Sequence, residues 1–260
     1  MILAAAFVAG ALTGAAAAGF AARRIAAERT QRYGRLFSFA MHELNTPVTA
    51  VNMTVINLLS GVFGDVPPDQ LKWIELTRDQ VGRMNGLVGE IRDLVHMELH
   101  RELHLNIGAA VPREIAEEAL ASLRRGFAYA NIELAVDVPE GLPPVRTDPD
   151  RAARCLSSAL FHARKFRVSG PVRLRAEVRG AAVAFEIEYV GKPLTAAQTE
   201  ESLEVFYPAR KRADQQLAAT GLGLGLVRAV MRRLDGDLTF AVDAKGLSRL
   251  TLTAPVEGKS

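Results

Sequence analysis

The first third of this chain is organised around the stretch Phe39-Ala40-Met41-His42-Glu43-Leu44-Asn45-Thr46-Pro47. It lies within an apolar stripe from Tyr33 to Val62, whose alternating steps of four and three residues predict a helix with one packing seam. His42 falls just off this seam, and Thr46 follows one turn later on the same face. This set suits phosphoryl transfer through histidine, because Glu43 can orient a ring proton and Thr46 can position a water. The alternative is a chance pair of surface residues.

A second helix is expected after a short turn. Gly61, Gly64, Pro67 and Pro68 interrupt the first helix, and a second apolar stripe then runs through residues 74–95. Two long helices with a short connection predict an antiparallel hairpin. Because one hairpin cannot bury its apolar face in water, we expect a homodimer in which two hairpins form a four-helix bundle.

The second half of the chain mixes helices with strands. Val172–Val178 and Val183–Tyr189 alternate like a β-hairpin, and further strands are expected near 132–136, 237–242 and 247–254. The predicted helices cover residues 112–126, 149–166 and 222–234. Because the strands are joined as hairpins rather than by repeated crossovers, we expect an α+β sandwich.

The N-terminus predicts a membrane anchor. Residues 2–22 carry no charge, are long enough to cross a bilayer and are followed at once by Arg23 and Arg24. The positive-inside rule then places the rest of the chain on the cytoplasmic side of a single span, with no room for an extracytoplasmic sensor domain. A cleaved signal peptide or a peripheral helix are the alternatives, since the segment is rich in alanine and glycine.

Composition excludes some other classes of protein. The net charge of +3 comes from scattered arginines, so no nucleic-acid partner is expected. Cys155 is the single cysteine, which rules out a disulfide within the chain and suits a small buried residue. We expect no metal-ligand cluster of protein side chains.

His42-Glu43-Leu44-Asn45-Thr46-Pro47 resembles the phospho-acceptor box of sensor histidine kinases, and the likeness extends over residues 30–255. The resemblance implies that His42 carries the phosphoryl group, that Glu43 assists its transfer and that Thr46 supports dephosphorylation of a response regulator. It implies a dimerisation and phosphotransfer domain over 25–104 and a GHKL-type ATPase-like domain over 105–260. These follow the expected anchor over 1–24, which we place in the bacterial cytoplasmic (inner) membrane.

The second domain departs from this pattern in the helix that the family uses to hold magnesium. The stretch Ser158–Phe166 is similar to the family's N-L-L-x-N-A-x-K-F, and Lys165 matches it. The two asparagines are replaced by Ser158 and His162. Since Mg²⁺ prefers oxygen ligands, the imidazole at position 162 is a poor replacement.

The two glycine boxes differ in how far they match. The family's D-x-G-x-G reads Tyr189-Val190-Gly191-Lys192-Pro193 here, so a phenol stands where the resemblance implies an aspartate for adenine. The glycine-rich helix start is retained at 220–225, where backbone amides can approach phosphate. The candidate cofactor residues are therefore Lys165, Gly191, Gly221 and Gly223, with ATP and Mg²⁺ as cofactors only if the altered site works.

These features favour a phosphotransferase similar to the relay histidine phosphotransferases derived from histidine kinases. His42 would exchange a phosphoryl group with the aspartate of a response-regulator receiver. An upstream hybrid kinase is a further candidate partner, and Glu43 and Thr46 would also permit a phosphatase role. One alternative is an active sensor kinase that phosphorylates His42 with ATP, and another is a non-catalytic dimeric adaptor. A different ligand for His162 and Tyr189 also stays open.

Overall fold

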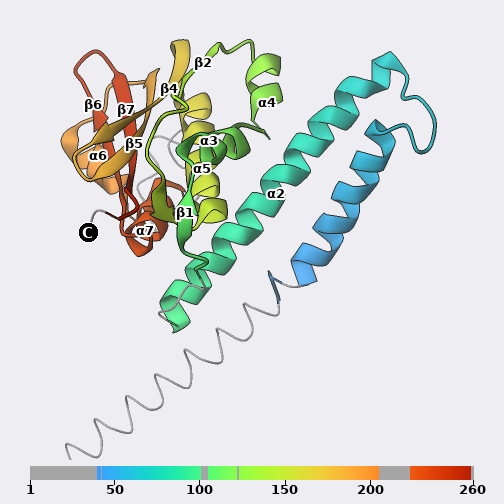
Figure 1. Cartoon of the computed structure of the whole chain (residues 1–260). Helices are drawn as coiled ribbons and strands as arrows, with labels where there is room; N and C mark the ends of the chain where they lie inside the picture. The colour runs from blue at the N-terminus through green and yellow to red at the C-terminus, as the bar shows by residue number, and fades with distance from the viewer. Residues whose placement is uncertain (1–39, 42, 101–104, 122, 205–222, 259–260) are drawn as a thin grey trace, which may run out of the picture.

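The computed structural model describes residues 40–41, 43–100, 105–121, 123–204 and 223–258 (Figure 1). These residues form a helical hairpin and a mixed α/β part, as the sequence predicts. The expected membrane span over residues 2–22 lies outside the described residues. Within the described part of the chain, no helix is long and apolar enough to cross a bilayer.

The hairpin pairs a helix over residues 43–59 with α2 (Pro68–His100), and the two lie side by side in Figure 1. Gly61 and Gly64 have positive φ angles of 76° and 100°, which are not helical and therefore end the first helix. Glycine suits both positions because other residues rarely adopt such angles. Pro68 then begins α2, where its missing amide hydrogen costs nothing.

The apolar seam divides into two rows. Met41, Val48 and Val55, spaced by seven residues, are buried together with Val81 of α2. The intervening seam positions point elsewhere, since Leu44 and Val51 remain 48% and 47% exposed. One row therefore closes the hairpin, and the other is left on its surface.

The α/β part contains a five-stranded sheet of order β2-β4-β5-β7-β6. β2 (Leu134–Asp137) pairs in parallel with β4 (Ser169–Arg179), and the other pairings are antiparallel. The remaining strands of this sheet are β5 (Ala182–Val190), β6 (Asp237–Val242) and β7 (Leu247–Pro255). A separate two-stranded ladder joins β1 (Gly108–Ala110) to β3 (Val145–Thr147).

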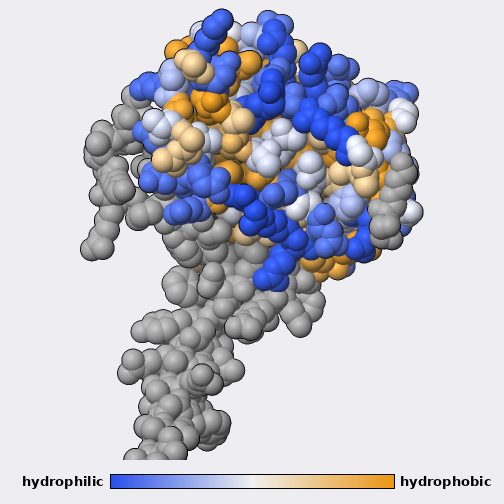
Figure 2. Space-filling view, turned by 90° about the vertical axis from the view of Figure 1, so that its left-hand side faces the viewer, coloured by the Kyte–Doolittle hydropathy of each residue, from blue (hydrophilic) through white to orange (hydrophobic). Residues whose placement is uncertain are grey.

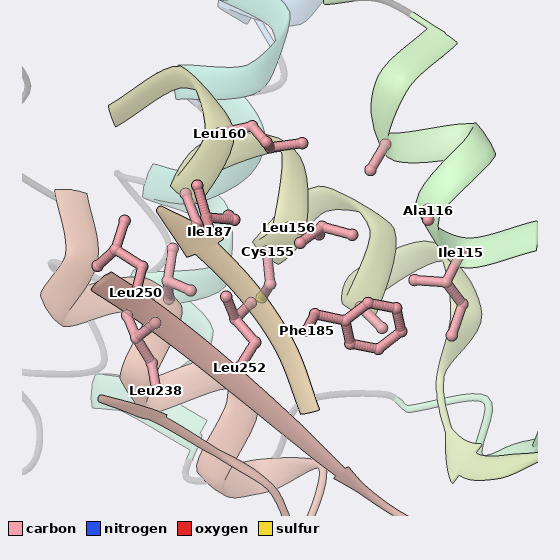
Figure 3. Packing of buried hydrophobic residues seen from close by; sticks show 14 of the residues in the cluster. Ile115, Ala116, Cys155, Leu156, Leu160, Phe185, Ile187, Leu238, Leu250 and Leu252 are labelled. Atoms are coloured by element: carbon pink, nitrogen blue, oxygen red, sulfur yellow. The ribbon is translucent and has the colours of Figure 1, made fainter. Parts of the chain in front are cut away.

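Helices cover one face of this sheet. They are α3 (Pro112–Ala121), α5 (Pro149–Phe166) and α7 (Gly223–Arg233), and they lie together on one side of the strands in Figure 1. Side chains of α5 and of the central strands point toward one another in the core, as Figure 3 shows for Leu156, Ile187 and Leu252. Cys155 is buried in this layer, which confirms its prediction as a core residue.

The opposite face of the sheet is polar. Arg179 donates to Glu186 at 2.6 Å, and Arg249 donates to Glu188 at 2.6 Å, so that charges of alternating sign bridge β4, β5 and β7. Figure 2 shows hydrophilic residues in a band across one face of the molecule, between apolar ones. A two-layer sandwich accounts for this pattern, because only the helix side of the sheet needs to be apolar.

The boundaries of α5 follow from its end groups. Asp148 is the N-cap, and its carboxylate accepts from the amides of Arg151 at 3.1 Å and Asn106 at 2.9 Å. Pro149 occupies the first turn, and Arg164 and Lys165 lie in the last turn, where their charge suits the helix dipole. The predicted helix over 149–166 is confirmed.

The prediction of one helix over residues 112–126 was wrong, because α3 is followed by the separate α4 (Arg124–Tyr129). Gly126 of α4 lies next to the guanidinium group of Arg164, which extends from α5. The helix α6 (Ala196–Glu201) was not predicted either. Its signal is the capping box in which the Thr195 side chain and Gln198 satisfy each other's backbone amides.

Candidate functional site

The first candidate site lies on the helix over residues 43–59. Glu43, Asn45 and Thr46 are exposed there, between the buried Met41 and Val48. His42 lies outside the described residues, so its pairing with Glu43 and Thr46 stays a prediction. Both partners expected for His42 are thus on the outer surface of the hairpin, where a second protein can reach them.

Pro47 adds a local feature to this helix. It has no amide hydrogen, so it cannot donate to the carbonyl oxygen of Glu43 four residues earlier. The helix nevertheless continues through Pro47 to residue 59. One backbone acceptor beside the expected phospho-acceptor is therefore left without its usual helical partner.

The second candidate site lies on α5. Ala159, Leu160 and Ala163 face the core, whereas Ser158, His162 and Lys165 retain exposed surface. Nζ of Lys165 lies 5.4 Å from the ring centroid of Phe166, which places its charge at the end of the helix.

His162 sits among other rings. Its centroid is 4.4 Å from that of Phe166, 5.7 Å from Phe240 and 6.2 Å from Tyr189. Burial in this setting, together with the nearby charge of Lys165, lowers the pKa of His162 from 6.5 to about 3. The imidazole is therefore neutral near pH 7, and its surroundings are largely apolar. A hard Mg²⁺ ion requires oxygen ligands, so the residues at this position do not fit magnesium.

Tyr189 is part of the core. It is 2% exposed and lies opposite Ser248 in the ladder between β5 and β7. Burial raises the pKa of the Tyr189 phenol well above its ordinary value. A buried phenol offers little to an adenine amino group.

Gly191 is used to close the same corner. Its amide donates to the carbonyl of Gly246 at 2.8 Å. A Cβ atom there would lie 3.0 Å from Cε2 of Tyr189 and 3.3 Å from the Phe166 carbonyl oxygen. The tight packing accounts for glycine at this position, and the amide is already paired, so Gly191 has no free donor for phosphate.

The other nucleotide candidates are placed only in part. Gly223 is the first residue of α7, as expected for a glycine-rich helix start, whereas Gly221 lies outside the described residues. Ser248 and Phe240 were not predicted to lie near this site. The alternating pattern of β6 and β7 could have indicated their position, because it places both side chains on the helix-facing side of the sheet with Leu238 and Leu250.

Two protein-family models match this chain. The model of the His Kinase A (phospho-acceptor) domain matches residues 32–99, and the model of the histidine kinase-, DNA gyrase B- and HSP90-like ATPase matches residues 147–258. The chain belongs to the sensor histidine kinase family. The helical hairpin and the α/β sandwich are thus the two domain folds of a histidine kinase.

Curated relatives of this histidine kinase homologue include the non-motile and phage-resistance protein of Caulobacter vibrioides, 24% identical over 83% of the chain and 26% of the relative. The adaptive-response sensory kinase SasA of Synechococcus sp. is 25% identical over 85% of the chain and 59% of the relative. The chain therefore spans only about a quarter to three-fifths of the length of these relatives.

Solved structures agree on the fold. The Acinetobacter baumannii histidine kinase AdeS has a TM-score of 0.54 and 21% identity over 84% of this chain and 98% of its own. Full-length ShkA in complex with AMPPNP has a TM-score of 0.58 and 19% identity over 85% of this chain and 46% of its own. These likenesses support the same order of hairpin and sandwich.

Proposed function

We propose that this histidine kinase homologue carries a phosphoryl group on His42 and exchanges it with the receiver aspartate of a response regulator, while its own ATP binding is impaired. The observation that carries the proposal is the position and burial of Tyr189. This residue stands where the family resemblance implies an adenine-binding aspartate, yet its ring is buried in the core, opposite Ser248 of β7.

The expected loss of ATP affinity favours another protein as the source of the phosphoryl group. A hydrogen bond to a charged group contributes roughly 1.5–3 kcal/mol, so loss of the adenine contact weakens binding about 10- to 150-fold. Loss of an oxygen ligand at position 162 adds a comparable penalty. It also harms chemistry, because the metal neutralises charge on the transferred phosphoryl group.

The transfer step itself needs no nucleotide. A ring nitrogen of His42 attacks the phosphorus of the receiver's aspartyl phosphate, the nitrogen–phosphorus bond forms, and the aspartate leaves with the electron pair of the broken oxygen–phosphorus bond. Glu43 accepts or orients the ring proton during this exchange. The exposed surface around Glu43 and Thr46 supports a docking protein as the phosphate donor.

A phosphatase role uses the same surface. The Thr46 hydroxyl positions a water for attack on the receiver's aspartyl phosphate, and inorganic phosphate and aspartate are the products. Both reactions imply a response-regulator receiver as partner, with an upstream hybrid kinase as a possible first donor. The matched phospho-acceptor domain and the exposed seam row support a homodimer. Attachment to the bacterial cytoplasmic membrane through residues 2–22 completes the proposal.

The second candidate function is an active sensor kinase. It is favoured by the match to the ATPase model over residues 147–258 and by α7, which begins at Gly223 as a phosphate-binding helix would. Labelled ATP with magnesium separates the two. A label on the unmodified chain that disappears in His42→Ala would establish the kinase.

The proposal is tested by mixing the purified full chain with a receiver protein labelled at its phospho-aspartate. We expect label to appear on the chain, to be stable to alkali as expected of a phosphoramidate, and to be absent from His42→Ala. If label never reaches His42 from any receiver, phosphotransfer is wrong. If His42→Ala also leaves signalling in cells unchanged, the adaptor alternative is correct.

A further inference from the structure

Four rings from three elements meet at the edge of the core beside the candidate nucleotide site. They are His162 and Phe166 of α5, Tyr189 of β5 and Phe240 of β6, here named the ring cluster. The His162 centroid lies between 4.4 and 6.2 Å from the other three, at tilted or edge-on angles of 44° to 80°. These separations and angles are those of stabilising aromatic pairs.

Backbone contacts lie beside the cluster. Gly191 packs closely against the Tyr189 ring and the carbonyl of Phe166. The Val168 amide also donates to the Val190 carbonyl at 2.8 Å, just beyond the two ends of the cluster. The end of α5 is therefore attached to the end of β5 by backbone and ring contacts together.

We propose that the ring cluster is a built-in substitute for a nucleotide, holding α5 against β5 and β6 without any ligand. This inference rests on the proposed function. In a domain that binds ATP, the ligand stabilises the folded state by mass action, so stability depends on nucleotide concentration. Here side chains supply the packing. The domain then has one ligand-independent conformation, and exchange at His42 does not respond to the ratio of ATP to ADP.

The chain offers a matched control for testing the cluster. Phe161 is an aromatic residue of the same helix outside the ring cluster, and its ring centroid lies 5.0 Å from the guanidinium carbon of Arg164. His162→Ala, Tyr189→Ala and the double variant are compared with Phe161→Ala by thermal unfolding of the full chain. Truncation of the buried Tyr189 to alanine is expected to lower Tm by about 10 °C, and truncation of the partly exposed His162 to lower it by less.

Coupling between the two positions is the decisive readout. Because His162 and Tyr189 share one contact, the double variant should lose clearly less than the two single losses added together. Additive losses, or losses no larger than that of Phe161→Ala, would overturn the inference. If an alanine variant does not fold, Tyr189→Leu and His162→Gln remove the rings while keeping more of the volume, and they give the same comparison with smaller shifts.

Nucleotide addition completes the experiment. The Tm of the unmodified chain should be the same with and without Mg–ATP or Mg–ADP, and the rate of transfer from a phosphorylated receiver should be equally indifferent. A rise of several degrees with Mg–ATP would contradict the ring cluster as a ligand substitute. Failure of the proposed function looks different, because His42 would stay unlabelled while the coupling of His162 with Tyr189 persisted.

Discussion

Tyr189 is an inward-facing residue near the end of β5, and its hydroxyl group must find a partner inside the core. Ser248, opposite it on β7, is 2% exposed and is a polar side chain beside the phenol. A buried hydroxyl without a hydrogen bond costs about 1–3 kcal/mol, so a polar neighbour favours this position of the phenol. At the scale of single residues, the altered nucleotide site is thus a packed part of the core.

His162 should make stability depend on pH. Its pKa is about 3 in the folded chain and 6.5 when unfolded, so between these values the unfolded state binds the extra proton. The contribution of the neutral His162 to the free energy of unfolding is then fully present above pH 6.5. It is lost as the pH drops toward 3, by at most about 1.4 kcal/mol per pH unit. Denaturant unfolding at several pH values measures this slope.

The control for this slope is His162→Gln, which cannot titrate. Burial keeps the neighbouring Tyr189 phenol protonated throughout this range. The variant should therefore show a shallower loss of stability below pH 6.5 than the unmodified chain. Equal slopes in the two proteins would mean that His162 is not the group responsible.

Thr46→Ala should separate two activities at the surface of the first helix. Removing the hydroxyl takes away the group proposed to position water, so dephosphorylation of a receiver should slow roughly 100-fold, within the range of such positioned groups. Transfer to His42 should change little, because it needs no water. Release of inorganic phosphate gives the first rate, and Thr49→Ala, also exposed on this helix, is the control.

At the scale of secondary-structure elements, the charged face of the sheet should contribute to stability. The side chain of Glu186 is 11% exposed. Its carboxylate forms an ion pair with the guanidinium of Arg179 at 2.6 Å and another with that of Arg249 at 3.5 Å. Glu186→Gln should lower the free energy of unfolding by about 1.5 kcal/mol. Glu177 also pairs with Arg179, but its side chain is largely exposed, so Glu177→Gln should change little. Urea unfolding would contradict this account if both variants were equally destabilised.

The long elements could be predicted because each carries its own signals. The helix over 149–166 begins at a capping Asp and Pro, and the hairpin strands alternate between core and solvent around Gly180, whose φ is 66°. The ladder β1–β3 could not be predicted in this way. Each of its strands has three residues, which pair only because the fold brings together segments 37 residues apart, Gly108–Ala110 and Val145–Thr147.

The candidate site shows the same division. Replacement of the expected aspartate by Tyr189 is visible in the sequence. The place where its ring packs depends on Ser248 and Phe240, which lie in strands much later in the chain. The closeness of Gly191 to the Phe166 carbonyl is likewise set by how α5 ends against β5. Chemistry at single positions was therefore predictable, whereas its packing needed the tertiary structure.

For the whole molecule, the exposed seam row of the hairpin carries the proposed dimer. Leu44 and Val51 lie outward from the buried row, and a charge there would be trapped in an apolar interface at a cost of several kcal/mol. Val51→Glu should therefore shift the full chain from dimer to monomer in sedimentation velocity. Val178→Glu changes a valine of similar exposure in the second domain and should leave the dimer intact. A dimer that persists in Val51→Glu would rule out this seam.

The source of the phosphoryl group on His42 is measured most directly with two isotopes in one tube. The full chain is incubated with a receiver carrying one phosphorus isotope and with magnesium and ATP carrying the other, and the ratio on His42 is read after a single short reaction. With Tyr189 buried and His162 unsuited to magnesium, receiver-derived label should exceed ATP-derived label by at least about tenfold, matching the weakest loss of affinity expected. Predominantly ATP-derived label on His42 would contradict the account.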